Sequence, residues 1–245
     1  MTVRQNGNRI MLLDSQGVPL FCWQLEQDAL LANRQMETIV ARLETIARAQ
    51  HLLRLKGGTG ESALEPPLDI QWGQVENGEK IQLPDKGATL RTGQSIYVSL
   101  HNTGSSTVFV SIFDIGITGN ITLLSYKARG VPIPAGGLEY LGDRDFDGTL
   151  LGLELSWPDG VPKEFTGYEA FAIVSTSEEH DLTTLQTTAT QRQQSPPRRG
   201  NDTSELLRIV DQISCGGARE ASPQQLHGFR YDVKPINFEL EPSKE

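Results

Sequence analysis

Apolar residues recur at intervals of three and four positions in LLANRQMETIVARLETIARAQHLLRL, residues 30–55, which is the spacing of one helix face. The stripe consists of Met36, Ile39, Val40, Leu43, Ile46, Ala47 and Leu53. The KGGTG that follows can supply the left-handed glycine that ends many helices. The pattern predicts an amphipathic helix whose stripe faces the protein core, although the same stripe could dock a separate domain.

A β-hairpin is predicted before this helix, in VRQNGNRIMLLDSQGVPLF. Asn6-Gly7 is a tight-turn dipeptide, and further turn residues occupy positions 15–19. After the helix, ESALEPP has the composition of a short linker. The hairpin and the helix are therefore expected to form one N-terminal segment.

From Leu68 onward the pattern changes to short runs rich in Ile, Val, Leu and Phe, separated by glycine, proline and asparagine, which predicts β-strands. The runs are LDIQWGQV, QSIYVSL, STVFVSIFDI, NITLLSY, LLGLELSW and YEAFAIVST. In QSIYVSL every second residue is aliphatic, so one face of that strand should be buried. In STVFVSIFDI both faces are apolar, which predicts a central strand or one covered on its outer side, with the amphipathic helix as the candidate cover.

The chain after Thr176 begins with a polar stretch rich in Gln and Thr, TTLQTTATQRQQSPPRRGNDTS, which predicts a flexible loop. A short helix, SELLRIVDQIS, follows, with Asp202 or Thr203 as its cap. The final FRYDVKPINFEL alternates in the manner of a strand, with Pro235 at a bend or an edge position. We expect this strand to return to the sheets formed by the preceding ones.

Short strands at this spacing favour a sandwich or barrel over alternating strand–helix units. The sequence predicts a mainly β fold, an antiparallel β-sandwich of Ig-like or jelly-roll-like type with the N-terminal hairpin and amphipathic helix packed on it. The predicted segments are 1–56 (hairpin and helix), 67–182 (β-sandwich), 183–203 (flexible loop) and 204–242 (short helix and a returning strand that completes the sandwich).

Charge and cysteine content narrow the possible partners. The formal net charge is −9 and the pI is about 5.0, which opposes nucleic-acid binding because such binding needs Lys and Arg to neutralise phosphates. Two distant cysteines make neither a disulfide framework nor a four-ligand zinc site. Without a signal peptide or an apolar run long enough to span a bilayer, the expected location is the cytoplasm, with no membrane partner.

The acidic segment GDRDFDGTLLGLE matches the spacing of a calcium-binding loop, with Asp143, Asp145, Asp147, Gly148 and Glu154 at the required positions. The flanking sequence contains prolines and glycines and does not predict the helices that normally hold such a loop. Glu154 also falls in an alternating strand pattern. A solvated acidic turn between strands is the favoured interpretation, and calcium binding stays open as an alternative.

Cys215 and His227 are the residue types of a cysteine nucleophile and its base. Both lie in polar, irregular sequence that offers no rigid support, so a free thiol is favoured over a catalytic dyad. Cys22, between Phe21 and Trp23, is predicted to be a small core residue.

The remaining candidates are single residues. Three histidines are predicted to be surface or capping residues, and three aromatic residues could line a sugar or peptide groove, although packing is the commoner role. These are His51, His101 and His180, and Trp72, Trp157 and Tyr168. The sequence therefore predicts no catalytic, cofactor-binding or metal-binding residue and no cofactor, while a pair of carboxylates that meets only in space stays possible.

The order of several short motifs carries a resemblance. GQSIYVSLHNTGSSTVFVSIFDIGITGNITLLS is followed by WPDGVP, by EAFAIVST and by a closing YDVKPINFEL. This order resembles the C-terminal, non-catalytic (accessory) region downstream of the protease domain in bacterial and fungal caspase-like (metacaspase-related) proteins. The family's protease half carries a His-Gly before its Cys, the opposite order to Cys215 and His227, so no catalytic residue carries over.

The resemblance implies a non-catalytic regulatory or protein-binding β-sandwich module associated with a caspase-like cysteine protease, its partner in cis or in trans. Two alternatives stay open. One is a calcium-binding β module that uses Asp143, Asp145, Asp147 and Glu154, and the other is an independent hydrolase with a spatially assembled site. For the chain alone, the prediction leans against enzymatic activity.

Overall fold

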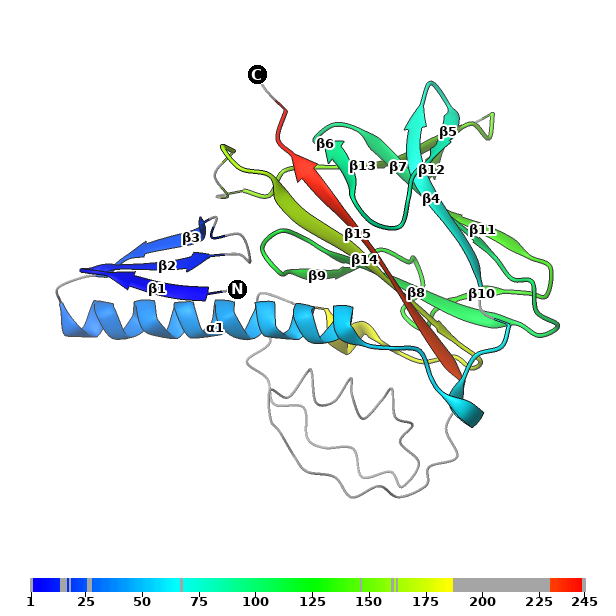
Figure 1. The fold of residues 1–245 in the computed structure, drawn as a ribbon. Helices are drawn as coiled ribbons and strands as arrows, with labels where there is room; N and C mark the ends of the chain where they lie inside the picture. The colour runs from blue at the N-terminus through cyan, green and yellow to red at the C-terminus, as the bar shows by residue number, and fades with distance from the viewer. Residues whose placement is uncertain are drawn as a thin grey trace.

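The computed structural model describes residues 2–13, 17, 19–25, 28–66, 68–145, 147–159, 161, 163–186 and 230–243. These residues form a mainly β protein with three sheets and one long helix near the N-terminus (Figure 1). Most of the predicted flexible loop, the predicted helix at 204–214, Cys215 and His227 lie outside the described residues. No helix within the described residues is long and apolar enough to cross a membrane.

The N-terminal sheet is antiparallel and has three strands, β1 (Thr2–Asn6), β2 (Arg9–Leu13) and β3 (Pro19–Gln24). Gly7 has a φ of +57°, which confirms the predicted tight turn between the first two. The predicted hairpin has two strands, whereas in the structure the chain reverses direction a second time and adds a third strand, β3. Ile10 pairs with Trp23 and Leu12 with Phe21, which places four apolar side chains on one face.

Helix α1 (Ala29–Arg54) begins at Asp28, whose Oδ1 accepts hydrogen bonds from the backbone N–H groups of Leu30 (2.9 Å) and Leu31 (3.1 Å). This N-cap satisfies two of the four donors that a helix start leaves unpaired. The predicted left-handed glycine cap is wrong, because the chain leaves the helix at Leu55 in an extended conformation with ψ 135°.

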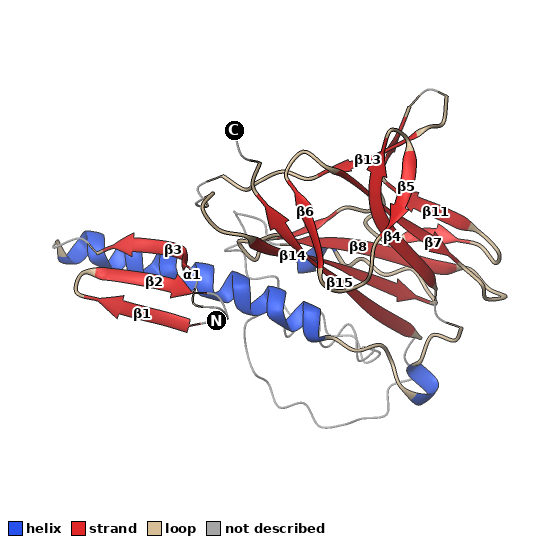
Figure 2. Cartoon of the chain, turned by 45° about the horizontal axis from the view of Figure 1, so that its top comes forward, coloured by secondary structure: helices blue, strands red, loops and turns tan. Residues whose placement is uncertain are grey.

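The buried face of α1 differs from the predicted stripe. Ile39, Ile46 and Leu52 are buried, but Met36 and Val40 are 43% and 48% exposed. The apolar pattern covers a wider arc than the helix can bury, and only the side facing the sheets is covered. The N-terminal sheet lies beside the first half of α1, and the second half runs along the rest of the protein (Figure 2).

The other strands form two six-stranded sheets, called sheet I and sheet II. Sheet I contains β6 (Ala88–Arg91), β8 (Val108–Ile115), β9 (Ile121–Leu123), β10 (Val131–Ile133), β14 (Gly167–Thr176) and β15 (Tyr231–Glu241). Sheet II contains β4 (Asp69–Glu76), β5 (Glu79–Gln82), β7 (Ser95–His101), β11 (Leu138–Leu141), β12 (Asp143–Arg144) and β13 (Leu150–Glu154). The predicted antiparallel pairing is confirmed throughout, except that β15 pairs with β6 in parallel. Two short 3₁₀ helices, Gly60–Ser62 and Thr183–Leu185, lie outside the sheets.

The two sheets pack face to face through one cluster of buried side chains. Trp72 of β4 lies 5.6 Å from Phe238 of β15, measured between ring centroids, and Phe238 lies 5.4 Å from Phe171 of β14. Ile96, Val98 and Leu100 of β7 all point into this cluster, as their alternation predicts; Val98 is one of its fully buried members. This cluster is the main core, because it joins strands that are far apart in the sequence.

A second buried cluster lies on the opposite, outer face of sheet I, under the last turns of α1. Ala49 and Leu52 of the helix pack with Phe113 and Ile115 of β8 and with Ala172 of β14. The prediction that a strand with two apolar faces is covered by the amphipathic helix is confirmed for β8.

The sequence predicts a bend or an edge position at Pro235 of β15, and the structure confirms the edge position. The strand is continuous from Tyr231 to Glu241 and pairs with β14 over nearly its whole length. Tyr231 and Val233 face the cluster under α1, whereas Phe238 faces the cluster between the sheets. The apolar residues of β15 therefore change from odd-numbered to even-numbered positions along the strand, because each end of the strand buries a different face. Pro235 lies where β15 has only β14 beside it, so its missing N–H leaves no gap in the ladder with β6.

Candidate functional site

Two acidic side chains come together at one end of sheet I. Asp114 follows Ile112 on the inward face of β8, and Glu169 precedes Phe171 on the inward face of β14. In the register of these strands Asp114 is opposite Phe171, so Asp114 and Glu169 are diagonal neighbours on one face. Glu169 is only 9% exposed. The fold therefore places two carboxyl groups side by side in a largely enclosed position.

The enclosed position changes how both groups bind protons. Burial raises the pKa of Asp114 to about 6. Burial first and the nearby charge of Asp114 second raise the pKa of Glu169 to about 8, against a lowering effect of the hydrogen bond from the backbone N–H of Ile117. Near pH 7 the pair therefore holds roughly one proton between its two carboxyl groups.

The carboxyl pair adjoins the turn that receives helix α1. In the turn at residues 116–120, the N–H of Gly116 donates to the carbonyl of Asn120 (3.1 Å) and the N–H of Gly119 donates to the carbonyl of Gly116 (2.8 Å). Gly119 has a φ of +77°, and a Cβ there would lie 2.8 Å from Cγ1 of Ile46 on α1. Only glycine fits this point, both for its backbone conformation and for its contact with the helix.

Arg42 links the N-terminal sheet to the same turn. Its guanidinium carbon lies 4.9 Å from the centroid of the Phe21 ring, and its Nη1 donates to Oδ1 of Asn120 at 3.4 Å. One side chain of α1 thus contacts β3 on one side and the turn between β8 and β9 on the other.

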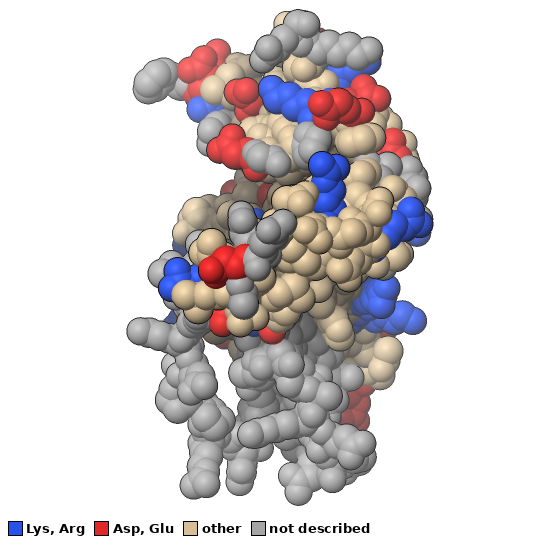
Figure 3. Space-filling model, turned by 90° about the vertical axis from the view of Figure 1, so that its left-hand side faces the viewer, with Lys and Arg blue, Asp and Glu red and all other residues tan. Residues whose placement is uncertain are grey.

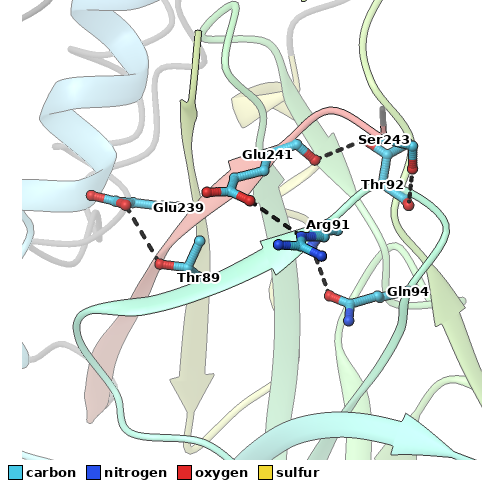
Figure 4. A network of polar contacts seen from close by, with 7 residues as sticks. All are labelled: Thr89, Arg91, Thr92, Gln94, Glu239, Glu241 and Ser243. Atoms are coloured by element: carbon cyan, nitrogen blue, oxygen red, sulfur yellow. Dashed lines mark hydrogen bonds and ion pairs between the residues drawn. The ribbon is translucent and has the colours of Figure 1, made fainter. Parts of the chain in front are cut away.

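Beyond the helix, the outer face of sheet I is polar and open to solvent. Glu239 on β15 accepts a hydrogen bond from Thr89 on β6 (3.5 Å), and Glu241 pairs with Arg91 (3.2 Å) (Figure 4). Tyr168 on β14 is 43% exposed, whereas Ala170, two residues further along, is 3% exposed. The cover provided by α1 therefore ends between these two positions.

The acidic motif forms a β-hairpin. Asp143 pairs with Gly152, and at the tip the N–H of Gly148 donates to the carbonyl of Asp145 (2.9 Å). The hydrogen bond from the N–H of Thr149 to Oδ1 of Asp147 (2.9 Å) lowers the pKa of that carboxyl group. Glu154 lies at the other end of β13, opposite Ser95. At about 3.3 Å per residue, the strand holds Glu154 roughly 13 Å from its start at the hairpin tip.

This geometry leads to a prediction about calcium. We expect calorimetric titration with calcium chloride to give no heat beyond dilution, because Glu154 and the tip of the hairpin are kept apart by a strand. A saturable binding signal that Asp145→Ala abolishes would contradict this expectation and establish the calcium-binding alternative. Asp145→Asn is the matched control, since it keeps the size of the side chain and removes its charge.

The other predicted residues do not come together. Cys22 is exposed on β3, so the prediction of a core residue is wrong; it points away from the helix because its neighbours Phe21 and Trp23 occupy the other face of the strand. His51 lies on α1, His101 on β7 and His180 after β14. Within the described residues, no group of three or more His, Cys, Asp or Glu side chains could hold a metal ion.

The aromatic candidates mostly serve packing. Trp72 is fully buried and its Nε1 donates to the carbonyl of Pro84 (3.2 Å). Trp157 packs at the margin of the main core and donates to the carbonyl of Val161 (3.0 Å). Tyr168 alone of the three lies on an open surface. The sequence gives no signal for the carboxyl pair, because Asp114 and Glu169 are 55 positions apart and adjoin only through the strand register.

The sequence matches no protein-family model, and no curated protein is significantly similar to it. Among solved structures, it is similar to the Pseudomonas fluorescens alkylpurine DNA glycosylase AlkC bound to DNA containing an abasic site analog, with 10% identity and a TM-score of 0.24. The match covers 61% of this chain and 37% of that chain. A likeness at this level carries no conclusion about fold or chemistry.

Proposed function

We propose that the chain is a non-catalytic regulatory or protein-binding module of the Ig-like or jelly-roll-like β-sandwich type, and that it works with a caspase-like cysteine protease in the cytoplasm. The order of motifs described above supports the link to the protease. The observation that carries the binding role is the exposed apolar surface of the N-terminal half of α1.

Four large apolar side chains on that half of the helix are exposed. Leu30 is 64%, Leu31 47%, Met36 43% and Val40 48% exposed. Figure 3 shows the side of the molecule at which α1 begins; charged side chains there lie mostly around a middle region of uncharged ones, polar residues included. Large apolar side chains exposed on one element mark a candidate surface for binding another protein.

The test uses the caspase-like protease domain encoded with this chain as the probe. We expect the two proteins to bind in biolayer interferometry, and the double variant Met36→Glu, Val40→Glu to weaken binding at least about tenfold, since a buried charge opposes an apolar contact. Tyr126→Glu is the matched control, because Tyr126 is 72% exposed on a loop after β9. Equal binding by both variants, or a locus that encodes no caspase-like domain, would contradict the proposal.

An independent hydrolase is a second candidate, because Asp114 and Glu169 hold one proton between them, as a general acid and base would. Their enclosed position favours the binding role, since a substrate must reach both groups. Turnover of ester or glycoside substrates that is lost in both Asp114→Asn and Glu169→Gln would favour the hydrolase instead.

A further inference from the structure

The outer face of sheet II carries a cluster of aromatic and cationic side chains, called here the Tyr140 cluster: Lys80, Tyr97, Ser99, Tyr140 and Arg144. Tyr97 and Ser99 point outward, since their neighbours on β7 point into the core. Tyr140 of β11 is directly opposite Ser99. Lys80 reaches over from β5, with its Nζ 5.9 Å from the ring centroid of Tyr97 and 4.8 Å from that of Tyr140. With Arg144 on β12, residues from three other strands thus lie beside the phenol of Tyr140.

The oxygen of Tyr140 accepts hydrogen bonds and has a proton to donate. Lys80 Nζ lies 3.1 Å from it as a donor. That hydrogen bond is the largest cause lowering the pKa of Tyr140; burial opposes it, and a hydrogen bond from Ser99 and the charge of Arg144 add to it. A phenol oxygen has two acceptor lone pairs and one O–H. The oxygen of Tyr140 therefore accepts a hydrogen bond from Lys80, and its hydroxyl group can also donate one.

Two cations lie beside Tyr140, one at its hydroxyl group and one over its ring. The guanidinium carbon of Arg144 lies 4.8 Å from the ring centroid of Tyr140, and its Nη1 uses one N–H on the carbonyl of Gly148 (3.0 Å). Among the side chains that the structure describes, which exclude that of Asp143, no ion pair joins Lys80 or Arg144 to an acidic group, although the chain has a net charge of −9. Both cations are exposed. An ammonium group, a guanidinium group and a phenol hydroxyl group are therefore neighbours at an exposed surface.

We propose that Lys80, Arg144 and the hydroxyl group of Tyr140 bind the dianionic phosphoryl group of a phosphate monoester. Three donors match its three terminal oxygens, and two positive charges match its charge. A guanidinium group contacts such oxygens in pairs, and an ammonium group acts as a point charge. The site goes beyond the proposed function, because it lies on sheet II and not on the exposed half of α1.

The test is an NMR titration of the full chain with inorganic phosphate and, separately, with O-phosphoserine. We expect saturable shifts at the Tyr140 cluster with a Kd on the order of millimolar, since exposed charge pairs contribute little each. Lys80→Met and Arg144→Met should each weaken binding about threefold to fivefold, and Tyr140→Phe by a smaller factor. Arg91→Met is the matched control, because Arg91 is an exposed arginine already paired with Glu241.

The two ligands separate the possible sources of the phosphoryl group. Binding of both supports a site that takes any phosphate monoester or free phosphate, and binding of O-phosphoserine alone supports a site for phosphorylated side chains. A second readout is the phenolate absorbance of Tyr140, whose midpoint should move to higher pH when a dianion is bound. Equal weakening by Arg91→Met and Lys80→Met, or variants that lose only thermal stability, would overturn the proposal.

Discussion

Replacing Leu52 with alanine is expected to lower the free energy of unfolding by about 2–5 kcal/mol. Leu52 is 0% exposed and lies in the cluster between α1 and the outer face of sheet I. Removing its side chain leaves a cavity beneath the helix, and the sheet below cannot move to fill it because its other face is packed against sheet II. Urea unfolding followed by circular dichroism measures the change.

Met36→Ala is the matched control on the same helix. Met36 is 43% exposed, so we expect its loss to change stability by no more than about 0.5 kcal/mol. Hydrogen exchange should also distinguish the two variants, since only Leu52→Ala should increase exchange in the last turns of α1. Equal effects of the two substitutions would mean that the helix is not packed on sheet I as described.

Glu169→Gln is expected to stabilise the protein at pH 8 and to leave it nearly unchanged at pH 5. The pKa of Glu169 is raised to about 8 by burial and by Asp114, whereas in the unfolded chain it returns to its ordinary value of 4.5. Between these values the folded state binds more protons than the unfolded state, so the free energy of unfolding falls as pH rises from about 4.5 and levels off above about 8.

The size of this effect follows from the shift in pKa. Each unit corresponds to about 1.4 kcal/mol, which gives at most on the order of 5 kcal/mol for Glu169. The pKa of Asp114 is raised from 3.8 to about 6. The free energy of unfolding should therefore also fall between pH 3.8 and about 6, in the wild type and in Glu169→Gln alike. Glutamine keeps the acceptor for the N–H of Ile117 but has no charge to lose, so its pH profile should be flatter.

Chemical denaturation at pH 5, 6, 7 and 8 measures both profiles. Glu239→Gln is the control, since Glu239 lies on the outer face of sheet I and its replacement should change stability by no more than about 0.5 kcal/mol at any pH. Parallel profiles of the wild type and Glu169→Gln would show that the carboxyl pair does not share a proton in the way described.

Several elements of the fold could be predicted because local periodicity reports burial. The 3.6-residue spacing after Leu30 predicts α1, and the two apolar faces of the segment around Phe113 predict a strand covered on both sides. The third N-terminal strand was not predicted, because the turn residues at positions 6–7 and 15–19 are also compatible with a single hairpin. For Pro235 the sequence left a bend and an edge position open, since a change of phase in one strand looks the same in sequence as a bend, and the structure shows the edge position.

The candidate sites depended on contacts that no local pattern contains. Asp114 and Glu169 meet because β8 and β14 pair in one register, and a shift of one residue would turn one carboxyl group to the outer face. The Tyr140 cluster likewise needs the strands that carry Lys80, Ser99 and Arg144 to lie in one sheet. The calcium motif shows the reverse case, in which a local pattern was present but the hairpin separated its parts.

By itself, the sequence determined that this chain is mainly β, that an amphipathic helix precedes the strands, and that one strand is covered on both faces. These properties follow from which side chains avoid water along short stretches of backbone. Only the tertiary structure decided which side of α1 is buried, which carboxyl groups become neighbours and which cations lie beside Tyr140. Those outcomes depend on strand register and sheet order, which bring together residues that the linear spacing of the chain leaves unrelated.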